Sequence, residues 1–155
     1  MTSIEKMDVR EAHAYFAKEC FNYSWELIEK GDRTQKETDA MIHLAHASLF
    51  HWSRRVDCTD QNLSVGYWQL SRVYALAGLG DCALRYAETC LTYSLQHGVA
   101  KVFLGYAHEA LARAYTLLGE EFQAKDHINQ AKEIADGLPH DARNQLLADL
   151  LDLSF

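Results

Sequence analysis

A nine-residue segment occurs twice in this chain, and its recurrence limits the possible folds more than any other feature of the sequence. Residues 70–78 read LSRVYALAG and residues 111–119 read LARAYTLLG, so leucine, arginine, tyrosine and the final glycine coincide at an offset of 41 residues. The match continues downstream, where Ala83 corresponds to Ala124. A repeat of this length indicates supersecondary units that stack and bury their apolar faces against one another.

The repeated units are predicted to be helical. The chain has one proline and no strand-like alternation, and its apolar residues recur at helical spacing. Helix starts are indicated at Asp8, followed three residues later by Glu11, and at Thr34, followed by Glu37. Glycines mark several helix ends. Seven helical segments are expected: one over about 8–30, one that begins at Thr34 and includes Trp52, and others over about 60–77, 81–97, 99–118, 120–136 and 139–153.

Composition narrows the class of protein further. A chain of 155 residues with 48% apolar residues can bury a substantial core, and it has no stretch of about 20 apolar residues that could span a membrane. The first ten residues contain Glu5 and Asp8 and no apolar run, so we expect no secretory signal and a cytoplasmic protein. A net charge of −7 disfavours nucleic acid as the main partner, because binding that polyanion needs clustered lysine and arginine.

The two units resemble the tetratricopeptide repeat. The characteristic positions of that family are occupied in one unit by Tyr67, Leu70, Ser71, Tyr74, Gly78, Ala83 and Cys90, and in the other by His108, Leu111, Ala112, Tyr115, Gly119, Ala124 and Ala131. Both copies are degenerate, because the offset is longer than the usual 34 residues and Ala87 and Ile128 replace an aromatic residue of the second helix. The chain also resembles small bacterial proteins of unassigned function, which adds no expected activity.

The resemblance implies an all-α fold, a right-handed stack of antiparallel helical hairpins. We expect one domain over residues 1–155, with a divergent first hairpin at 1–58, repeats at 59–98 and 99–137, and a capping helix at 138–155.

The last helix has two predicted faces. Its apolar stripe consists of Leu146, Leu147, Leu150, Leu151 and Leu153. A polar outer face, as a cap requires, could come from His140, Asp141, Arg143, Asn144, Asp149 and Asp152. The alternative is a structural subunit that forms a homodimer through this stripe, which light scattering at high micromolar concentration would detect.

In the tetratricopeptide family, the first helices of the repeats line a groove that binds extended peptides. Tyr106, Glu109 and Arg113 share one face of the 99–118 helix, and Trp68 and Arg72 are the counterparts of Glu109 and Arg113 one repeat earlier. These five residues form the predicted partner-binding groove. A pair of guanidinium groups suits a carboxylate or phosphate, so we expect a protein or peptide partner with an acidic group. Alternatively, Glu109 only pairs with Arg113 on a solvated face, which is worth about 0.3 kcal/mol.

Histidines offer a second alternative, a metal-dependent helical enzyme or a metal-binding protein. Asp39, His43 and His46 lie at spacings of four and three residues, so one helix face presents two imidazoles and a carboxylate. His51 lies five residues after His46 and leaves that face. A metal site would therefore need a further ligand from another helix.

No catalytic motif is recognised. The turn at residues 78–80 is no phosphate-binding loop, because it lacks the lysine and hydroxyl residue and follows a helix rather than a strand. Cys20, Cys58, Cys82 and Cys90 lack the spacing of a metal site and are expected to fill a reduced core. The predicted function is an adaptor or regulatory binding module with no cofactor and no enzymatic activity.

Overall fold

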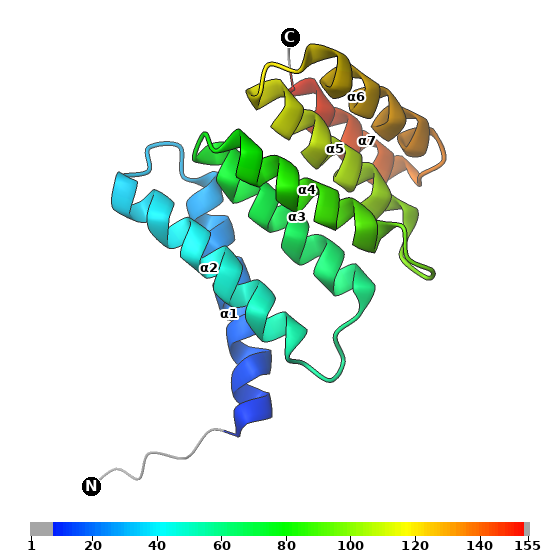
Figure 1. Ribbon diagram of the computed structural model, residues 1–155. Coiled ribbons are helices and arrows are strands. Elements are labelled where there is room, and N and C mark those ends of the chain that lie inside the picture. The colour runs from blue at the N-terminus through cyan, green and yellow to red at the C-terminus, as the bar shows by residue number, and fades with distance from the viewer. Residues whose placement is uncertain (1–7, 154–155) are drawn as a thin grey trace, which may run out of the picture. The chain divides into compact units, whose positions relative to one another are not determined.

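The computed structural model describes residues 8–153, which form seven helices and no strand (Figure 1). The helices are α1 (Val9–Glu29), α2 (Gln35–Ser53), α3 (Asp60–Leu76), α4 (Gly80–Ser94), α5 (Lys101–Leu117), α6 (Glu121–Asp136) and α7 (His140–Leu151). The prediction of an all-α chain of about seven helices is confirmed. None of these helices combines the length and apolar character that crossing a membrane requires.

Local sequence explains where two of the helices begin. At the start of α2, the Thr34 hydroxyl accepts from the backbone N–H of Glu37, and the Glu37 carboxylate accepts from the backbone N–H of Thr34. This is the reciprocal arrangement that the sequence predicted. At α1 the prediction is only partly right, since the Asp8 carboxylate caps the N–H of Arg10 while no reciprocal bond from Glu11 forms.

The turns after α3 and α5 have the same geometry, as the repeat predicted. Gly78 and Gly119 adopt φ angles of 76° and 75°, in the left-handed region that favours glycine. The backbone N–H after each glycine reaches back to the carbonyl of the repeated tyrosine, Tyr74 at 2.9 Å and Tyr115 at 3.0 Å. In both copies, the glycine and the tyrosine of the motif therefore belong to the same hydrogen-bonded turn, which ends the helix.

The chain divides into two compact units, and the boundary falls between Cys58 and Thr59. This is where the sequence predicted the end of the first hairpin, whereas the grouping of both units into one domain stays a prediction. Unit 1 consists of α1 and α2, which pack against each other. Two buried serines lie at their contact, where Ser24 donates to the carbonyl of Met41 at 3.0 Å and Ser48 donates to that of Ala17 at 2.8 Å. Small polar residues let these two helices approach closely.

Unit 2 has two layers (Figure 1). Helices α3, α5 and α7 lie next to one another in a three-helix layer, α4 packs against α3 and α5, and α6 packs against α5 and α7. Small side chains fill the space between the layers, as the tetratricopeptide-like pattern predicted. The four small residues that the motif places in the second helix of each repeat are fully buried, namely Ala83, Cys90, Ala124 and Ala131. A helical repeat fold is compatible with this arrangement.

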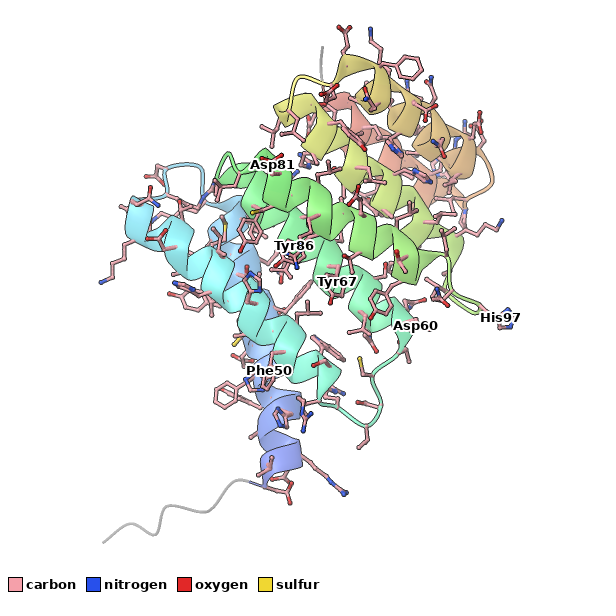
Figure 2. The ribbon with its side chains drawn as sticks, in the orientation of Figure 1. Phe50, Asp60, Tyr67, Asp81, Tyr86 and His97 are labelled. Carbon is pink, nitrogen blue, oxygen red and sulfur yellow. The ribbon has the colours of Figure 1, made fainter. Side chains whose placement is uncertain are left out.

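Aromatic side chains line the seam between α3 and α4. Tyr67 of α3 stacks on Tyr93 and Tyr86 of α4, with ring centroids 5.5 and 6.2 Å apart, and Tyr74 stacks on Tyr86 at 5.4 Å. Figure 2 labels Tyr67 and Tyr86 in this stack. These tyrosines are half-buried and belong to the packing of the first repeat.

Helix α7 closes the far end of unit 2. Leu146, Leu150 and Leu153 are buried and pack with small residues of α5 and α6, including Ala112 and Ala131. The predicted leucine stripe is therefore divided, because Leu147 is only half-buried and Leu151 is 79% exposed.

Candidate functional site

The five predicted groove residues come together in unit 2, at the contact between α3 and α5. Trp68 and Arg72 lie on α3, and Tyr106, Glu109 and Arg113 lie on α5. The rings of Trp68 and Tyr106 meet edge to face, with centroids 5.9 Å apart and planes at 78°. The common repeat places equivalent turns of the two helices side by side, so residues 41 positions apart become neighbours.

Glu109 is the buried centre of this cluster, with a side chain that is only 1% exposed. Its Oε2 accepts a hydrogen bond from Trp68 Nε1 at 3.1 Å, and its Oε1 accepts one from Arg113 Nη2. The pairing of Glu109 with Arg113 therefore forms, but the expectation of a solvated face is wrong, because the Arg113 side chain is only 17% exposed. Glu109 balances the charge of Arg113, which makes this arginine part of the packing of unit 2.

Arg72 differs from Arg113. None of the ion pairs among residues 8–153 involves Arg72, and its Nε is buried without a hydrogen-bond partner among these residues. Burial, and then the charge of Arg113, lower the pKa of Arg72, whereas the nearby carboxylates oppose that shift. A guanidinium remains charged in proteins, so Arg72 is a cation that has lost water and gained no hydrogen bond at Nε.

The carboxylates of Asp149 in α7 and of Asp152, the residue after α7, complete the surroundings of Arg72. Asp149 accepts from Tyr106 Oη at 2.8 Å and from Gln145 Nε2 at 3.2 Å, and burial together with this carboxylate raises the pKa of Tyr106. The charges of Asp149 and Asp152 also act on Arg72. The assignment of Asp149 to the polar outer face of the cap is therefore wrong, because Asp149 is half-buried against α5.

A hollow of about 200 Å³ opens beside Arg113, about one helical turn further along α3 from Arg72. It lies among α3, α5 and the end of α7, and its lining consists of Ala75, Leu76, Arg113, Thr116, Leu117, Asp152 and Leu153. Ala75 and Leu76 follow Arg72 by three and four residues, so they lie on the same side of α3. The hollow offers apolar contact beside a charged group.

The histidine face predicted on α2 gains no further metal ligand among residues 8–153. His43 is exposed and His46 is half-buried, and burial followed by the charge of His43 lowers the pKa of His46. His51 instead faces His13 of α1, with their Nδ1 atoms 2.8 Å apart. Across residues 8–153, no three His, Cys, Asp or Glu side chains gather closely enough to hold a metal ion. Nothing in the described chain therefore favours the metal alternative.

A second histidine pair lies in unit 2 and was not foreseen. The repeat motif placed His108 at a position that is usually bulky, and the structure shows it only 7% exposed. Its Nδ1 lies 2.9 Å from Nδ1 of His127 on α6, and the two rings stack. Burial, and then the charge of His127, lower the pKa of His108 to about 4, although Asp126 opposes the shift. Pairing across two helices cannot be inferred from the spacing within one.

This pair leads us to expect that unit 2 loses stability as the pH falls from about 7 to about 4. Unfolded histidine binds a proton near pH 6.5, whereas folded His108 resists protonation down to about pH 4, so the unfolded state takes up more protons in this window. The loss attributable to His108 is on the order of 3 kcal/mol. Guanidinium unfolding at several pH values should show a flatter pH dependence in His108→Leu than in wild type.

The exposed His97, labelled in Figure 2, supplies the control for this experiment. His97→Ala is a suitable control because it removes an exposed histidine outside the His108–His127 pair. If the unfolding free energies of wild type and His108→Leu changed equally between pH 4 and 7, the pH dependence would not come from His108.

The four cysteines are free thiols. Cys90 is buried, and burial raises the pKa of its thiol to about 11, which suits the predicted role as a core filler. Cys20, Cys58 and Cys82 are only half-buried.

Comparison of the chain with models of protein families, with curated proteins and with solved structures finds no match. The function of the cluster around Arg72 is therefore inferred from its own geometry and charge.

Proposed function

We propose that this chain is a protein-binding module with a tetratricopeptide-like array, in which Arg72 binds an acidic group of a partner peptide. The observation that carries the proposal is the state of Arg72, a cation whose buried Nε has no partner within residues 8–153. A carboxylate or phosphate could accept charge-assisted hydrogen bonds from this guanidinium. The hollow beside Arg113, one helical turn further along α3 from Arg72, would receive a neighbouring side chain of the peptide.

The surrounding charges favour Arg72 over Arg113 as the anchor. Glu109 already binds Arg113, and Asp149 already accepts from Tyr106 and Gln145. Trp68 and Tyr106 flank the arginines and supply the aromatic surface that often anchors peptides. We further propose that the module acts in the cytoplasm, which the four free thiols support, since disulfides are rare there.

The proposal is tested with peptides selected from a random library for binding to the wild-type protein. We expect the selected peptides to contain a carboxylate whose amidation weakens binding. Because a hydrogen-bonded charged contact is worth about 1.5–3 kcal/mol, Arg72→Ala should weaken binding by roughly ten- to a hundredfold in fluorescence anisotropy. Raising the salt concentration should also weaken binding.

Two controls make the result specific. Arg85→Ala removes an exposed arginine of α4 that lies over Tyr86, and it should leave the affinity unchanged. Circular dichroism should show that Arg72→Ala is folded. If Arg72→Ala bound the selected acidic peptides as tightly as wild type, the assignment of the site would be wrong.

A further inference from the structure

Helix α7 lies at one end of the three-helix layer (Figure 1), and one of its sides is uncovered within residues 59–153. Helix α4 packs against both α3 and α5, and α6 packs against both α5 and α7. Within residues 59–153, α7 packs against α5 and α6, and no further helix of this range covers its remaining side. The position that a following second helix of a repeat would occupy is therefore open in the described part of unit 2.

This open side is a groove of about 680 Å³ between α6 and α7. Its lining is formed by Lys125, Ile128, Asn129 and Lys132 of α6, and by Leu147, Leu150, Leu151 and Leu153 at and just beyond α7. Five of these eight residues are aliphatic, and Leu151 is 79% exposed. Aliphatic side chains that line an open groove are typical of a surface that binds an amphipathic helix.

The charge of the groove indicates which kind of helix would fit. Lys125 and Lys132 are seven residues apart, two helical turns, so they stand on the same side of α6. Lys125 binds Glu121 at 2.5 Å in an exposed pair, whereas Lys132 has no ion pair within residues 8–153. In a chain with a net charge of −7, this wall presents Lys132 without an ion pair in the described residues, and Lys125 paired with Glu121, beside a leucine surface. Carboxylates along the border of a bound helix would complement it.

We propose that the groove between α6 and α7 binds one amphipathic helix of a partner protein, with aliphatic residues on its buried face and carboxylates on its border. The helices α4 and α6 already lie between neighbouring helices in this way, so the bound helix would continue the packing of unit 2. Helix α7 has 12 residues and is about 18 Å long, so a partner helix of three to four turns would span the groove. Arg72 does not line this groove, although Leu153 lines both the groove and the hollow beside Arg113.

The test uses synthetic helical peptides of defined composition. The probe is a fluorescein-labelled peptide of about 18 residues with leucine at one face, glutamate along both borders and alanine elsewhere. One comparison peptide carries lysine in place of glutamate, and another has the same composition in an order that scatters the leucines. We expect saturable binding of the glutamate peptide to the full chain, at least tenfold tighter than binding of either comparison peptide.

Two substitutions locate the binding. Leu151→Glu should weaken binding of the glutamate peptide at least tenfold, because the substitution places a carboxylate in the leucine surface. In Lys125→Glu/Lys132→Glu the preference should reverse, so that the lysine peptide binds more tightly than the glutamate peptide. Phe122→Glu is the matched control. Phe122 lies on α6 with the two lysines and is 84% exposed, but it does not line the groove. Its affinity should equal that of wild type.

The proposal is overturned if the glutamate peptide does not bind, if Leu151→Glu leaves its affinity unchanged, or if the charge reversal does not reverse the preference. It is also overturned if light scattering shows a wild-type dimer that Leu151→Glu converts to a monomer. In that case a second copy of the chain occupies the groove.

Discussion

Glu109→Ala is expected to lower the unfolding free energy of unit 2 by about 3–5 kcal/mol. The substitution removes a buried carboxylate and leaves Arg113 without the group that balances its charge. It also removes the oxygen to which the Trp68 indole donates. Arg113 and Arg72 would then be two cations in a poorly hydrated seam with less compensation. Equilibrium unfolding in guanidinium, followed by circular dichroism, measures the loss.

Variants at the partner residue test whether the pair acts as a unit. Arg113→Met should lower the unfolding free energy by a similar amount, because it leaves the Glu109 carboxylate buried and without its cation. The double variant Glu109→Leu/Arg113→Met should cost much less than the sum of the two single changes, since it leaves no unbalanced charge. Glu109→Gln keeps the shape and is expected to cost about 1–3 kcal/mol. Additive costs, or single changes that cost less than about 1 kcal/mol, would show that the pair is solvated.

Gly105→Leu is expected to cost more than about 3 kcal/mol and to loosen α7 from α5. A Cβ atom at Gly105 would lie 2.6 Å from Cδ2 of Leu146 and 3.4 Å from Cγ2 of Ile134. Leu146 is fully buried, and the close packing of protein interiors opposes its displacement. Hydrogen exchange measured by mass spectrometry should show faster exchange in α7, together with lower resistance of the protein to denaturant.

Smaller and compensating changes show whether space is the cause. Gly105→Ala should have a small net effect, because about 1 kcal/mol gained in helix propensity opposes about 1–3 kcal/mol of overpacking. Leu146→Ala alone should cost about 2–5 kcal/mol through the cavity it leaves, and the double variant Gly105→Leu/Leu146→Ala should cost less than the sum. Gly137→Ala is the control, since its Cβ would meet nothing closer than 3.7 Å. Unchanged exchange of α7 in Gly105→Leu would contradict the close approach.

The helices and the repeat could be predicted from the sequence because local signals determine them. The Thr34–Glu37 capping pair marked the start of α2, and Gly78 and Gly119 marked equivalent turns. The repeat offset identified Trp68 as the counterpart of Glu109, and the two are joined because equivalent turns of the two helices pack together.

The rest of the site depends on contacts that no local pattern encodes. The burial of Glu109 was missed because charged residues at helical spacing normally indicate a solvated face. Asp149 was missed because α7 carries no copy of the repeated motif, so nothing in the sequence indicated its neighbour on α5. The pairing of His108 with His127 depends on how α5 and α6 are rotated against each other.

The polar bonds across the three-helix layer have a consequence for how unit 2 folds. The bond between Trp68 and Glu109 joins residues 41 positions apart, and the bond between Tyr106 and Asp149 joins residues 43 positions apart. Each bond therefore closes a loop of nearly the same length, and the entropy of closing such a loop depends only weakly on length. Each successive helix can dock on the one before at a nearly constant entropic cost, so folding can propagate along the layer without contacts between distant ends of the chain.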